Sequence, residues 1–156
     1  MKVINQDITT IETGIIGHQC NCRGVMGGGV ALAIQHKWPK TYKDYMTAYK
    51  EGKLVLGNVI PSMVSTIEED PLIVMHLCGQ FHYGRSTVYT NYDALEKALI
   101  EMKRLQCLYS EAYGSRLPIY LPYGIGCGLA GGEWRIVEPI IEKIIPDVIL
   151  CKFGGK

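Results

Sequence analysis

Two glycine-rich loops are the parts of this sequence best suited to chemistry. One runs from Gly24 to Val30 and the other from Gly124 to Gly132, and each is expected to follow a strand and precede a helix. Glycine lets backbone N–H groups approach an anion, because no Cβ stands in the way. The following helix adds unpaired N–H groups and the positive end of its dipole. The pattern predicts two backbone cradles, which together suit a diphosphate.

Both loops are expected at the same edge of the fold. Ligands of open α/β sheets collect at the carboxyl ends of the strands, so the two loops could face each other across one crevice. Each loop could instead be only a tight turn. Two familiar phosphate motifs do not fit. The chain has no GxxxxGK[ST] sequence, and Gly126-x-Gly128-x-x-Gly131 lies too near the C-terminus for a dinucleotide-binding βαβ half to follow it.

The charge balance argues against several function classes. Lys and Arg number 16 and Asp and Glu 15, giving a formal net charge of +1 without any run of like charges. A nucleic-acid partner is not expected, because such binding needs many contacts between basic side chains and phosphates. No apolar run approaches the ~18 residues of a membrane helix, and the chain does not start like a signal peptide. We therefore expect a cytoplasmic monomer with no membrane association.

The cysteines suggest neither a metal site nor a disulfide framework. The six are Cys20, Cys22, Cys78, Cys107, Cys127 and Cys151. They contain no CxxC pair, and most fall in apolar, strand-like segments, so we expect reduced, mostly buried thiols and no metal or cofactor. Cys127 lies in the second loop, near an expected helix N-terminus, where a thiolate is favoured. No arginine-rich cradle follows it, so we do not expect a cysteine nucleophile.

Short β-branched runs alternate with helical patterns along the whole chain. The expected strands are Lys2–Asn5, Ile15–Cys20, Val55–Pro61, Leu72–Cys78, Leu117–Pro122 and Val148–Phe153. The third and fourth flank the acidic turn 68–71, which indicates a hairpin. The expected helices are Val30–His36, one from Pro39 that Gly52 closes, one from the N-cap Asn91 towards Tyr113, and Glu133–Ile145 with a kink at Pro139. This order predicts a three-layer α/β/α fold with a mixed central sheet, as one domain over residues 1–156.

At these loops the sequence resembles the macrodomains, modules that bind ADP-ribose. The stretch 17–31, GHQCNCRGVMGGGVA, resembles their first ligand loop, and most closely that of the ADP-ribose 1″-phosphate phosphatase-like branch. The stretch 122–129, PYGIGCGL, is similar to their second loop, which wraps the diphosphate and the distal ribose. The resemblance covers almost the whole chain and implies a six- or seven-stranded mixed sheet between helical layers.

The resemblance also implies roles for individual residues. Asp7, with Ile8 beside it, would accept a hydrogen bond from the adenine amino group, Asn21 would bind the distal ribose hydroxyls, and Phe153 would pack on the adenine. The residues implied to line the distal ribose and diphosphate are Gly27, Gly28, Gly29, Val30, Gly124, Ile125, Gly126, Cys127, Gly128 and Leu129. Other interpretations stay open: Asp7 could cap a turn, Asn21 could form an Asx turn, and Phe153 could belong to the core.

The catalytic residues are less sharply indicated. One glycohydrolase branch of the family uses a lysine in mid-chain and an aspartate directly after GCGL, but Ala130 follows that motif here and residues 77–85 contain no lysine. His18-x-x-Asn21 does match the arrangement proposed as catalytic in phosphatase-like members. An imidazole there could protonate a leaving ribose hydroxyl or activate water. His18 could equally be a buried core histidine.

The segment from Gly79 to Arg85 is a further polar candidate. His82, Tyr83 and Arg85 could form a flap over the distal ribose or its phosphate, and the guanidinium could pair with a terminal phosphate. The same segment could be a plain surface loop.

The leading hypothesis is a protein that binds ADP-ribose and hydrolyses ADP-ribose 1″-phosphate to ADP-ribose and phosphate. His18 and Asn21 would be the catalytic residues. One alternative is a non-catalytic reader of ADP-ribose or of ADP-ribosylated protein. Another is a hydrolase of a different ADP-ribose conjugate, such as an ester-linked one.

Overall fold

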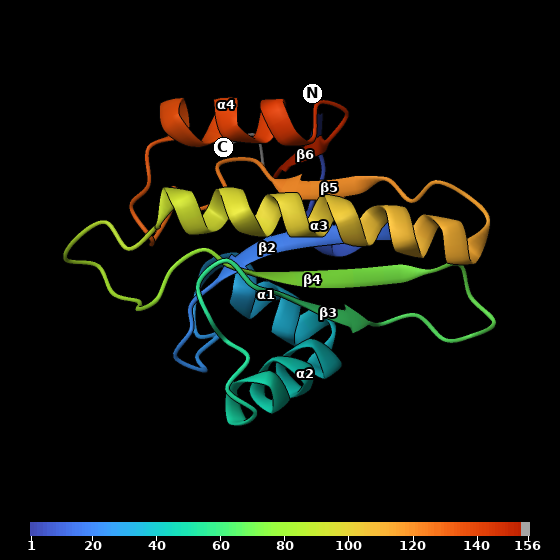
Figure 1. Cartoon of the computed structure of the whole chain (residues 1–156), viewed down its shortest axis with the longest axis horizontal. Coiled ribbons are helices and arrows are strands. Elements are labelled where there is room, and N and C mark those ends of the chain that lie inside the picture. Colours follow the sequence, from blue (N-terminus) through green and yellow to red (C-terminus); the bar gives the residue numbers. More distant parts are fainter. Residues whose placement is uncertain (154–156) are drawn as a thin grey trace.

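Six strands form a single mixed sheet in the computed structural model, which describes residues 1–153 (Figure 1). Their spatial order is β1-β6-β5-β2-β4-β3. The strands are β1 (Lys2–Asn5), β2 (Gly14–Cys20), β3 (Val59–Met63), β4 (Leu72–Cys78), β5 (Ile119–Pro122) and β6 (Ile149–Lys152). All neighbouring strands are parallel except β3, which pairs antiparallel with β4. The predicted hairpin around the acidic turn is therefore confirmed.

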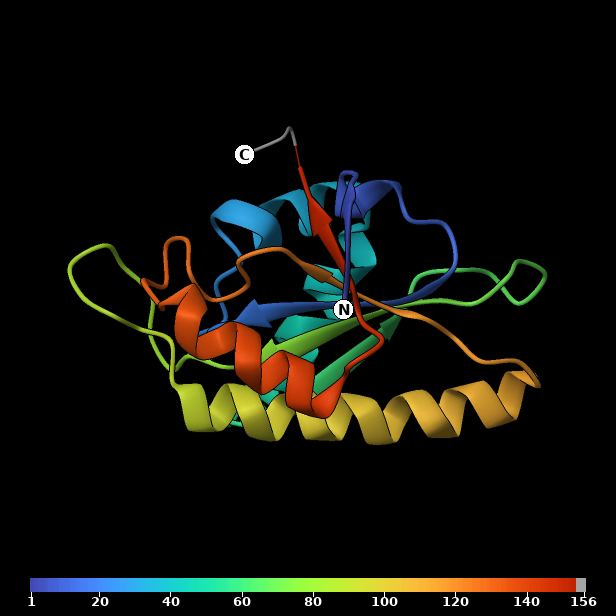
Figure 2. The same ribbon diagram turned by 90° about the horizontal axis from the view of Figure 1, so that it is seen from above.

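Four helices cover the two faces of the sheet. They are α1 (Gly29–Lys37), α2 (Pro39–Lys50), α3 (Tyr92–Tyr113) and α4 (Trp134–Ile144), and a short 3₁₀ turn spans Ile8–Thr10. Helices α1 and α2 lie on one face, and α3 and α4 lie on the other (Figure 2). The predicted three-layer α/β/α architecture with a mixed sheet is confirmed. All described strands share one sheet, whereas a single domain over all 156 residues stays a prediction.

The central strand β2 sends alternate side chains into two separate cores. Ile15 belongs to the core under α3 and α4, while Ile16 and Cys20 belong to the core under α1 and α2. At Gly17 a Cβ would lie 2.7 Å from a methyl group of Leu121, so the α3 side tolerates no larger residue there. By the same alternation His18 faces the α1–α2 layer and Gln19 faces the α3–α4 side.

Most element boundaries fall within a few residues of the prediction. The largest difference is at β3, expected from Val55 but observed from Val59, because residues 55–58 form a turn closed by the Asn58 N–H on the Val55 carbonyl (2.9 Å). Helix α3 begins where Asn91 was expected to cap it, and the Asn91 side chain accepts from the Ala94 N–H at 3.0 Å. Pro139 lies inside α4, which continues to Ile144.

Candidate functional site

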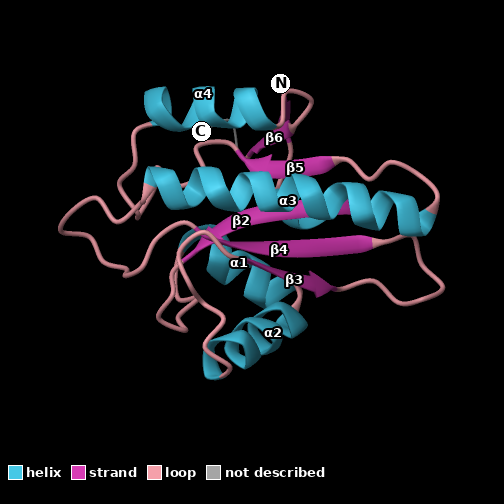
Figure 3. Cartoon of the chain, in the orientation of Figure 1, coloured by secondary structure: helices cyan, strands magenta, loops and turns pink. Residues whose placement is uncertain are grey.

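A cavity of about 800 Å³ opens at the carboxyl ends of β5, β2 and β4. Three connections wall it: loop one (residues 21–28, β2 to α1), loop two (residues 123–133, β5 to α4) and the β4–α3 segment (residues 79–91). They leave the same edge because these three strands are parallel neighbours, and they lie together at the left of Figures 1 and 3. The volume falls within the range of pockets for small organic ligands and cofactors.

The two glycine loops meet over this cavity. A Cβ added at Gly28 would lie only 2.9 Å from the Leu129 side chain, so loop one touches loop two at this point. Gly126 has a φ of +77°, and a Cβ there would lie 3.1 Å from Gln19 Oε1. A side chain at Gly28 would displace Leu129, and one at Gly126 would press on Gln19 and strain the backbone. The crevice expected from the sequence is present.

The two loops present their backbones to the cavity in different ways. Loop one leads directly into the first turn of α1, and Gly29, Val30 and Ala31 of that turn line the cavity. The N–H groups of a first helical turn have no partner within the helix, so they are free for an anion. Helix α4 begins only at Trp134, beyond the last lining residue of loop two, Ala130. The expectation of a second helix N-terminus at the site is therefore wrong, and loop two contributes turns alone.

Most of the residues predicted for the site do line the cavity. They are His18, Asn21, Gly27, Gly28, Gly29, Val30, Gly124, Ile125, Gly126, Gly128 and Leu129. Four do not: Asp7, Ile8, Cys127 and Phe153. Their roles in ligand binding stay predictions.

These four residues have clear structural settings. Asp7 Oδ1 accepts hydrogen bonds from the Thr9 N–H (2.9 Å) and hydroxyl (2.8 Å), so it caps the 3₁₀ turn as the alternative interpretation held. Ile8 is buried in the core under α1 and α2. Phe153 is 66% exposed directly after β6, so it is not a core residue and its ring is free to cover a ligand.

Cys127 is half-buried and packs against the core under α3 and α4. Burial raises the pKa of its thiol, so the sequence argument for a favoured thiolate is wrong. The other cysteines are free thiols as well: Cys20, Cys22, Cys78 and Cys151 are buried, whereas Cys107 is exposed. Within residues 1–153 no group of three metal-binding side chains comes together. Over the same residues, none of the helices has the length and apolarity required to span a membrane.

Asn21 organises loop one from within. Its Oδ1 accepts from the Arg23 N–H at 2.9 Å, which makes an Asx turn, and its Nδ2 donates to the Val25 carbonyl at 2.7 Å. Tyr45 of α2 is fully buried beneath the loop. Its hydroxyl donates to the Asn21 backbone carbonyl at 2.6 Å and lies 2.9 Å from Asn21 Oδ1. Asn21 is thus fixed at the cavity wall, with one of its two amide hydrogens already committed.

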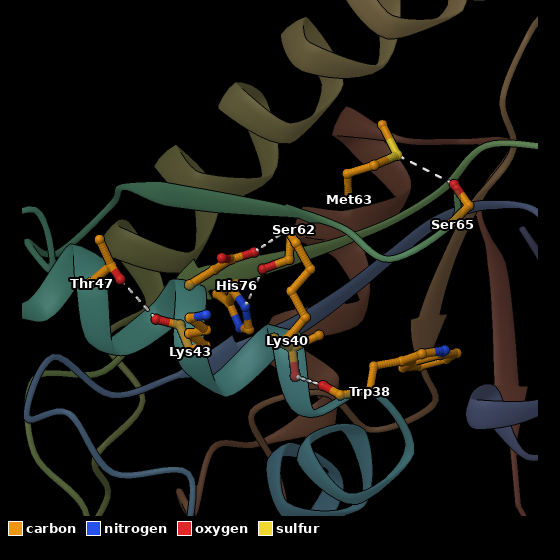
Figure 4. Close-up of polar contacts among 10 residues, drawn as sticks. Trp38, Lys40, Lys43, Thr47, Ser62, Met63, Ser65 and His76 are labelled. Carbon is orange, nitrogen blue, oxygen red and sulfur yellow. Dashed lines mark hydrogen bonds and ion pairs between the residues drawn. The ribbon is translucent and has the colours of Figure 1, made fainter. Parts of the chain in front are cut away.

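His18 belongs to a buried chain of polar groups that crosses three strands. Its Nε2 lies 2.7 Å from His76 Nδ1 on β4. Figure 4 shows the next contact of this chain, in which His76 Nε2 lies 3.2 Å from Ser62 Oγ on β3. His18 is 1% exposed, and burial lowers its pKa to about 4. Burial, and then the neighbouring His18, lower the pKa of His76 well below the usual value for histidine. Both rings are neutral at pH 7, so His18 can accept a proton there but carries none to donate as an imidazolium.

The sequence interpretation missed Gln19 and Gln80 and left Arg85 outside the binding set. Gln19 Nε2 donates to Gln80 Oε1 (2.8 Å) and to Thr90 Oγ1 (3.0 Å), and the Thr90 hydroxyl donates to the Gly126 carbonyl (2.6 Å). We call this arrangement the Gln19 brace, because it ties β2, the β4–α3 segment and loop two together. The sequence offered one signal for Gln19, because it is a polar residue near the end of a buried strand, shortly before a glycine loop. Tyr83 and Arg85 of the suggested flap line the cavity, whereas His82 does not.

A mixed sheet between two helical layers, with two glycine loops meeting over one cavity, defines an α/β/α fold whose site suits a ligand that contains a diphosphate. The chain belongs to the macrodomain family, since the Macro domain family model matches residues 18–141.

Individual relatives agree with this assignment. The chain is 28% identical over 153 residues to an ADP-ribose 1″-phosphate phosphatase of Saccharomyces cerevisiae, covering 86% of this chain and 85% of the relative. It is 29% identical over 146 residues to a DNA ADP-ribosyl glycohydrolase of Mycobacterium tuberculosis, covering 91% of this chain but only 38% of that protein. The macrodomain of Thermus aquaticus DarG superposes with a TM-score of 0.75 at 22% identity over 98% of this chain and 97% of that one, which shows the shared fold.

Proposed function

We propose that this protein binds ADP-ribose and hydrolyses ADP-ribose 1″-phosphate to ADP-ribose and phosphate. The observation that carries the proposal is the contact between the two glycine loops over one cavity, with the N-terminus of α1 in its wall. Free backbone N–H groups suit a diphosphate in a protein whose net charge is only +1. Similarity to a phosphatase along 86% of the chain supports the reaction.

The order of the strands indicates how ADP-ribose would lie along the cavity. Asp7 follows β1 and Phe153 follows β6, so both lie on the β6 side of loop two, while loop one and the β4–α3 segment lie on the other side. In the proposed pose the adenine takes the side of Asp7, Ile8 and Phe153. The diphosphate lies between the two loops, and the distal ribose lies at Asn21.

Hydrolysis requires water to attack phosphorus while the bond from phosphorus to the 1″ oxygen breaks and that oxygen gains a proton. In the proposal neutral His18 takes the proton from the attacking water, and the imidazolium that forms then gives this proton to the 1″ oxygen as its bond to phosphorus breaks. Because Nε2 is engaged with His76, the proton acceptor would be Nδ1. Nδ1 is a buried atom that has no hydrogen-bond partner among the described residues. Asn21 would hold the ribose so that its 1″ oxygen faces the water.

Phosphate release from ADP-ribose 1″-phosphate, measured alongside calorimetry with ADP-ribose, tests the proposal. We expect release by the wild type, a large loss of kcat in His18→Ala with ADP-ribose affinity retained, and a loss of affinity in Asn21→Ala. Release that persists in His18→Ala but vanishes in Asn21→Ala would show that the acid–base role is misassigned. Absence of both release and binding in the wild type would refute the function.

A non-catalytic reader of ADP-ribose or ADP-ribosylated protein is the second candidate. The deep burial of His18, and the absence of Asp and Glu from the residues that line the cavity, favour it. Tight ADP-ribose binding without phosphate release, unchanged in His18→Ala, would select the reader. The relation to a DNA ADP-ribosyl glycohydrolase keeps hydrolysis of another ADP-ribose conjugate, such as an ester, as the third assay. For all three we propose a monomer acting in the cytoplasm.

A further inference from the structure

Within residues 1–153, Arg85 has no ion-pair or cation–π partner, and no other lining residue of the cavity carries a formal charge. Among the described residues that line the cavity it is the one charged side chain at neutral pH, since His18 is neutral there and no Asp or Glu lines the wall. A single positive group in a neutral cavity acts on a ligand more strongly than the net charge of +1 suggests, because no carboxylate beside it offsets its field.

The other four arginines each interact with a protein group. Arg23 stacks over the Phe81 ring at 5.7 Å, and the remaining three form ion pairs: Arg104 with Glu101, Arg116 with Asp147 and Arg135 with Glu133. Within residues 1–153 Arg85 has neither kind of partner. Its guanidinium is therefore available to an anion that enters the cavity.

The backbone that carries Arg85 is held on both sides. Before it, Gln80 takes part in the Gln19 brace and also donates through Nε2 to the His82 carbonyl at 2.9 Å. After it, the Tyr89 N–H donates to the Ala130 carbonyl of loop two at 2.7 Å, and the Tyr89 hydroxyl lies 2.9 Å from Ser86 Oγ. Arg85 thus lies between two anchored points and cannot swing away from the cavity with the whole segment.

The position of Arg85 along the cavity selects which end of the ligand it meets. The strand order β6-β5-β2-β4 places Phe153 at one end, loops two and one in the middle, and the β4–α3 segment at the other end. Three strand spacings of about 4.8 Å separate β6 from β4, roughly 14 Å in all. A ligand that puts its adenine at the β6 end and its diphosphate between the loops brings its far sugar to Arg85.

We infer that Arg85 recognises a terminal phosphomonoester on that far sugar and so makes the site selective for phosphorylated ADP-ribose over ADP-ribose itself. The inference rests on the proposed function and names the substrate class of the same site. A phosphomonoester carries a charge of about −1.5 to −2 at pH 7, and the planar guanidinium binds such a group through two parallel hydrogen bonds. A ribose hydroxyl or a neutral ester at the same position gives Arg85 no charge to pair with.

Arg85→Gln, Arg85→Lys and the control Arg104→Gln test the inference. Calorimetry with ADP-ribose and with ADP-ribose 1″-phosphate gives both affinities, and the rate of phosphate release gives KM. We expect Arg85→Gln to weaken the phosphorylated ligand about 10- to 100-fold while changing ADP-ribose affinity less than about twofold. Arg85→Lys should recover part of the loss, because it keeps the charge but loses the paired geometry. Arg104→Gln removes an equal charge from an exposed position on α3, outside the cavity lining, and should change neither affinity.

Two results would overturn the inference without touching the proposed function. If Arg85→Gln weakens both ligands equally, the guanidinium binds the diphosphate that they share. If it weakens neither, Arg85 binds no part of the ligand. A wild type that binds neither ligand refutes the proposed function, and the Arg85 inference with it. Melting temperatures of the three variants, expected to match the wild type because both arginines are exposed, control for folding.

Discussion

Loop one and the β4–α3 segment wall the same cavity but are held in contrasting ways. Loop one rests on a buried polar network, in which Tyr45 and His76 are both fully buried and Asn21 is 7% exposed. The β4–α3 segment is largely exposed, with Phe81 at 53%, Tyr83 at 46% and Arg85 open to solvent. The first wall is part of the protein core, whereas the second is held by the Gln19 brace and by backbone hydrogen bonds to the two loops, such as that from the Tyr89 N–H to the Ala130 carbonyl.

This difference indicates a division of labour within the site. A wall built on the core fixes its backbone N–H groups before any ligand arrives, so binding there requires little ordering. An exposed segment can change residues at little cost in stability, which suits the choice of what the ligand carries at its end. Changes in the first wall should therefore lower stability and affinity together, and changes in the second should alter ligand preference alone.

Separating the two glycine loops should have the largest effect on binding. Gly28→Val places a side chain where a Cβ alone would lie 2.9 Å from a methyl group of Leu129, so either the Leu129 side chain rotates, leaving the valine between the loops, or the loops move apart. We expect ADP-ribose affinity to fall more than about 100-fold by calorimetry. Gly52→Ala is the control: Gly52 has a φ of +72° and open space around it, outside the cavity, so the substitution should cost about 1 kcal/mol of stability and no affinity. Equal affinities in the two variants would contradict loop contact as the basis of the site.

Lowering the pH should destabilise the fold, because it favours protonation of the buried histidines His18 and His76. The pKa of His18 is about 4 in the fold against 6.5 when unfolded, so between these values the unfolded chain binds the proton and the folded chain does not. Stability is therefore complete above pH 6.5 and is lost as the pH falls towards 4, by up to about 3 kcal/mol for His18. His76 acts in the same direction.

Urea unfolding between pH 4.5 and 7.5 measures this loss. We expect His18→Gln to flatten the dependence on pH, while His36→Gln, which removes an exposed histidine of α1, leaves it unchanged. Identical profiles for the two variants would show that the buried pair does not govern acid sensitivity.

The fold was largely predictable because it depends on local patterns. Apolar runs marked the strands, Asn91 marked the start of α3, and the acidic turn marked the β3–β4 hairpin. The early start expected for β3 was wrong because a turn at Gly57, with a φ of +90°, interrupts an otherwise β-branched run. Sequence periodicity does not register such a turn.

The parts of the site built from glycines could be predicted from the sequence. The parts that depend on contacts between distant strands could not. Both loops were located from their glycines, because a positive φ, as at Gly126, and a close contact, as between Gly28 and Leu129, favour that residue. The partner of His18 lies 58 residues away, and only the pairing of β2 with β4 brings His76 opposite it. The Gln19 brace likewise joins residues 61 and 71 positions apart. Neither contact leaves a periodic trace in the chain.

Removing the Gln19 brace should lower ligand affinity by an intermediate amount, because the brace contacts both loop two and the β4–α3 segment. Gln19→Met removes the donors to Gln80 and Thr90 and frees both loop two and the β4–α3 segment, so we expect about a tenfold loss of ADP-ribose affinity. Gln106→Met is the matched control, since this buried glutamine of α3 donates to the Leu117 carbonyl far from the cavity lining. It should lower the melting temperature without changing affinity. Equal affinity losses in the two variants would indicate a general effect on stability.

The smallest effect is expected for a substitution in the exposed β4–α3 segment. Phe81 is 53% exposed and does not line the cavity; its ring lies under the Arg23 guanidinium, and its backbone carbonyl, which a substitution of the side chain keeps, accepts from the Cys22 N–H at 3.0 Å. Phe81→Ser should change the free energy of unfolding by less than about 0.5 kcal/mol and leave ADP-ribose affinity unaltered, by urea unfolding and calorimetry. A loss of stability above about 1 kcal/mol would show that the β4–α3 segment is built into the core as loop one is. The contrast between the two walls would then not hold.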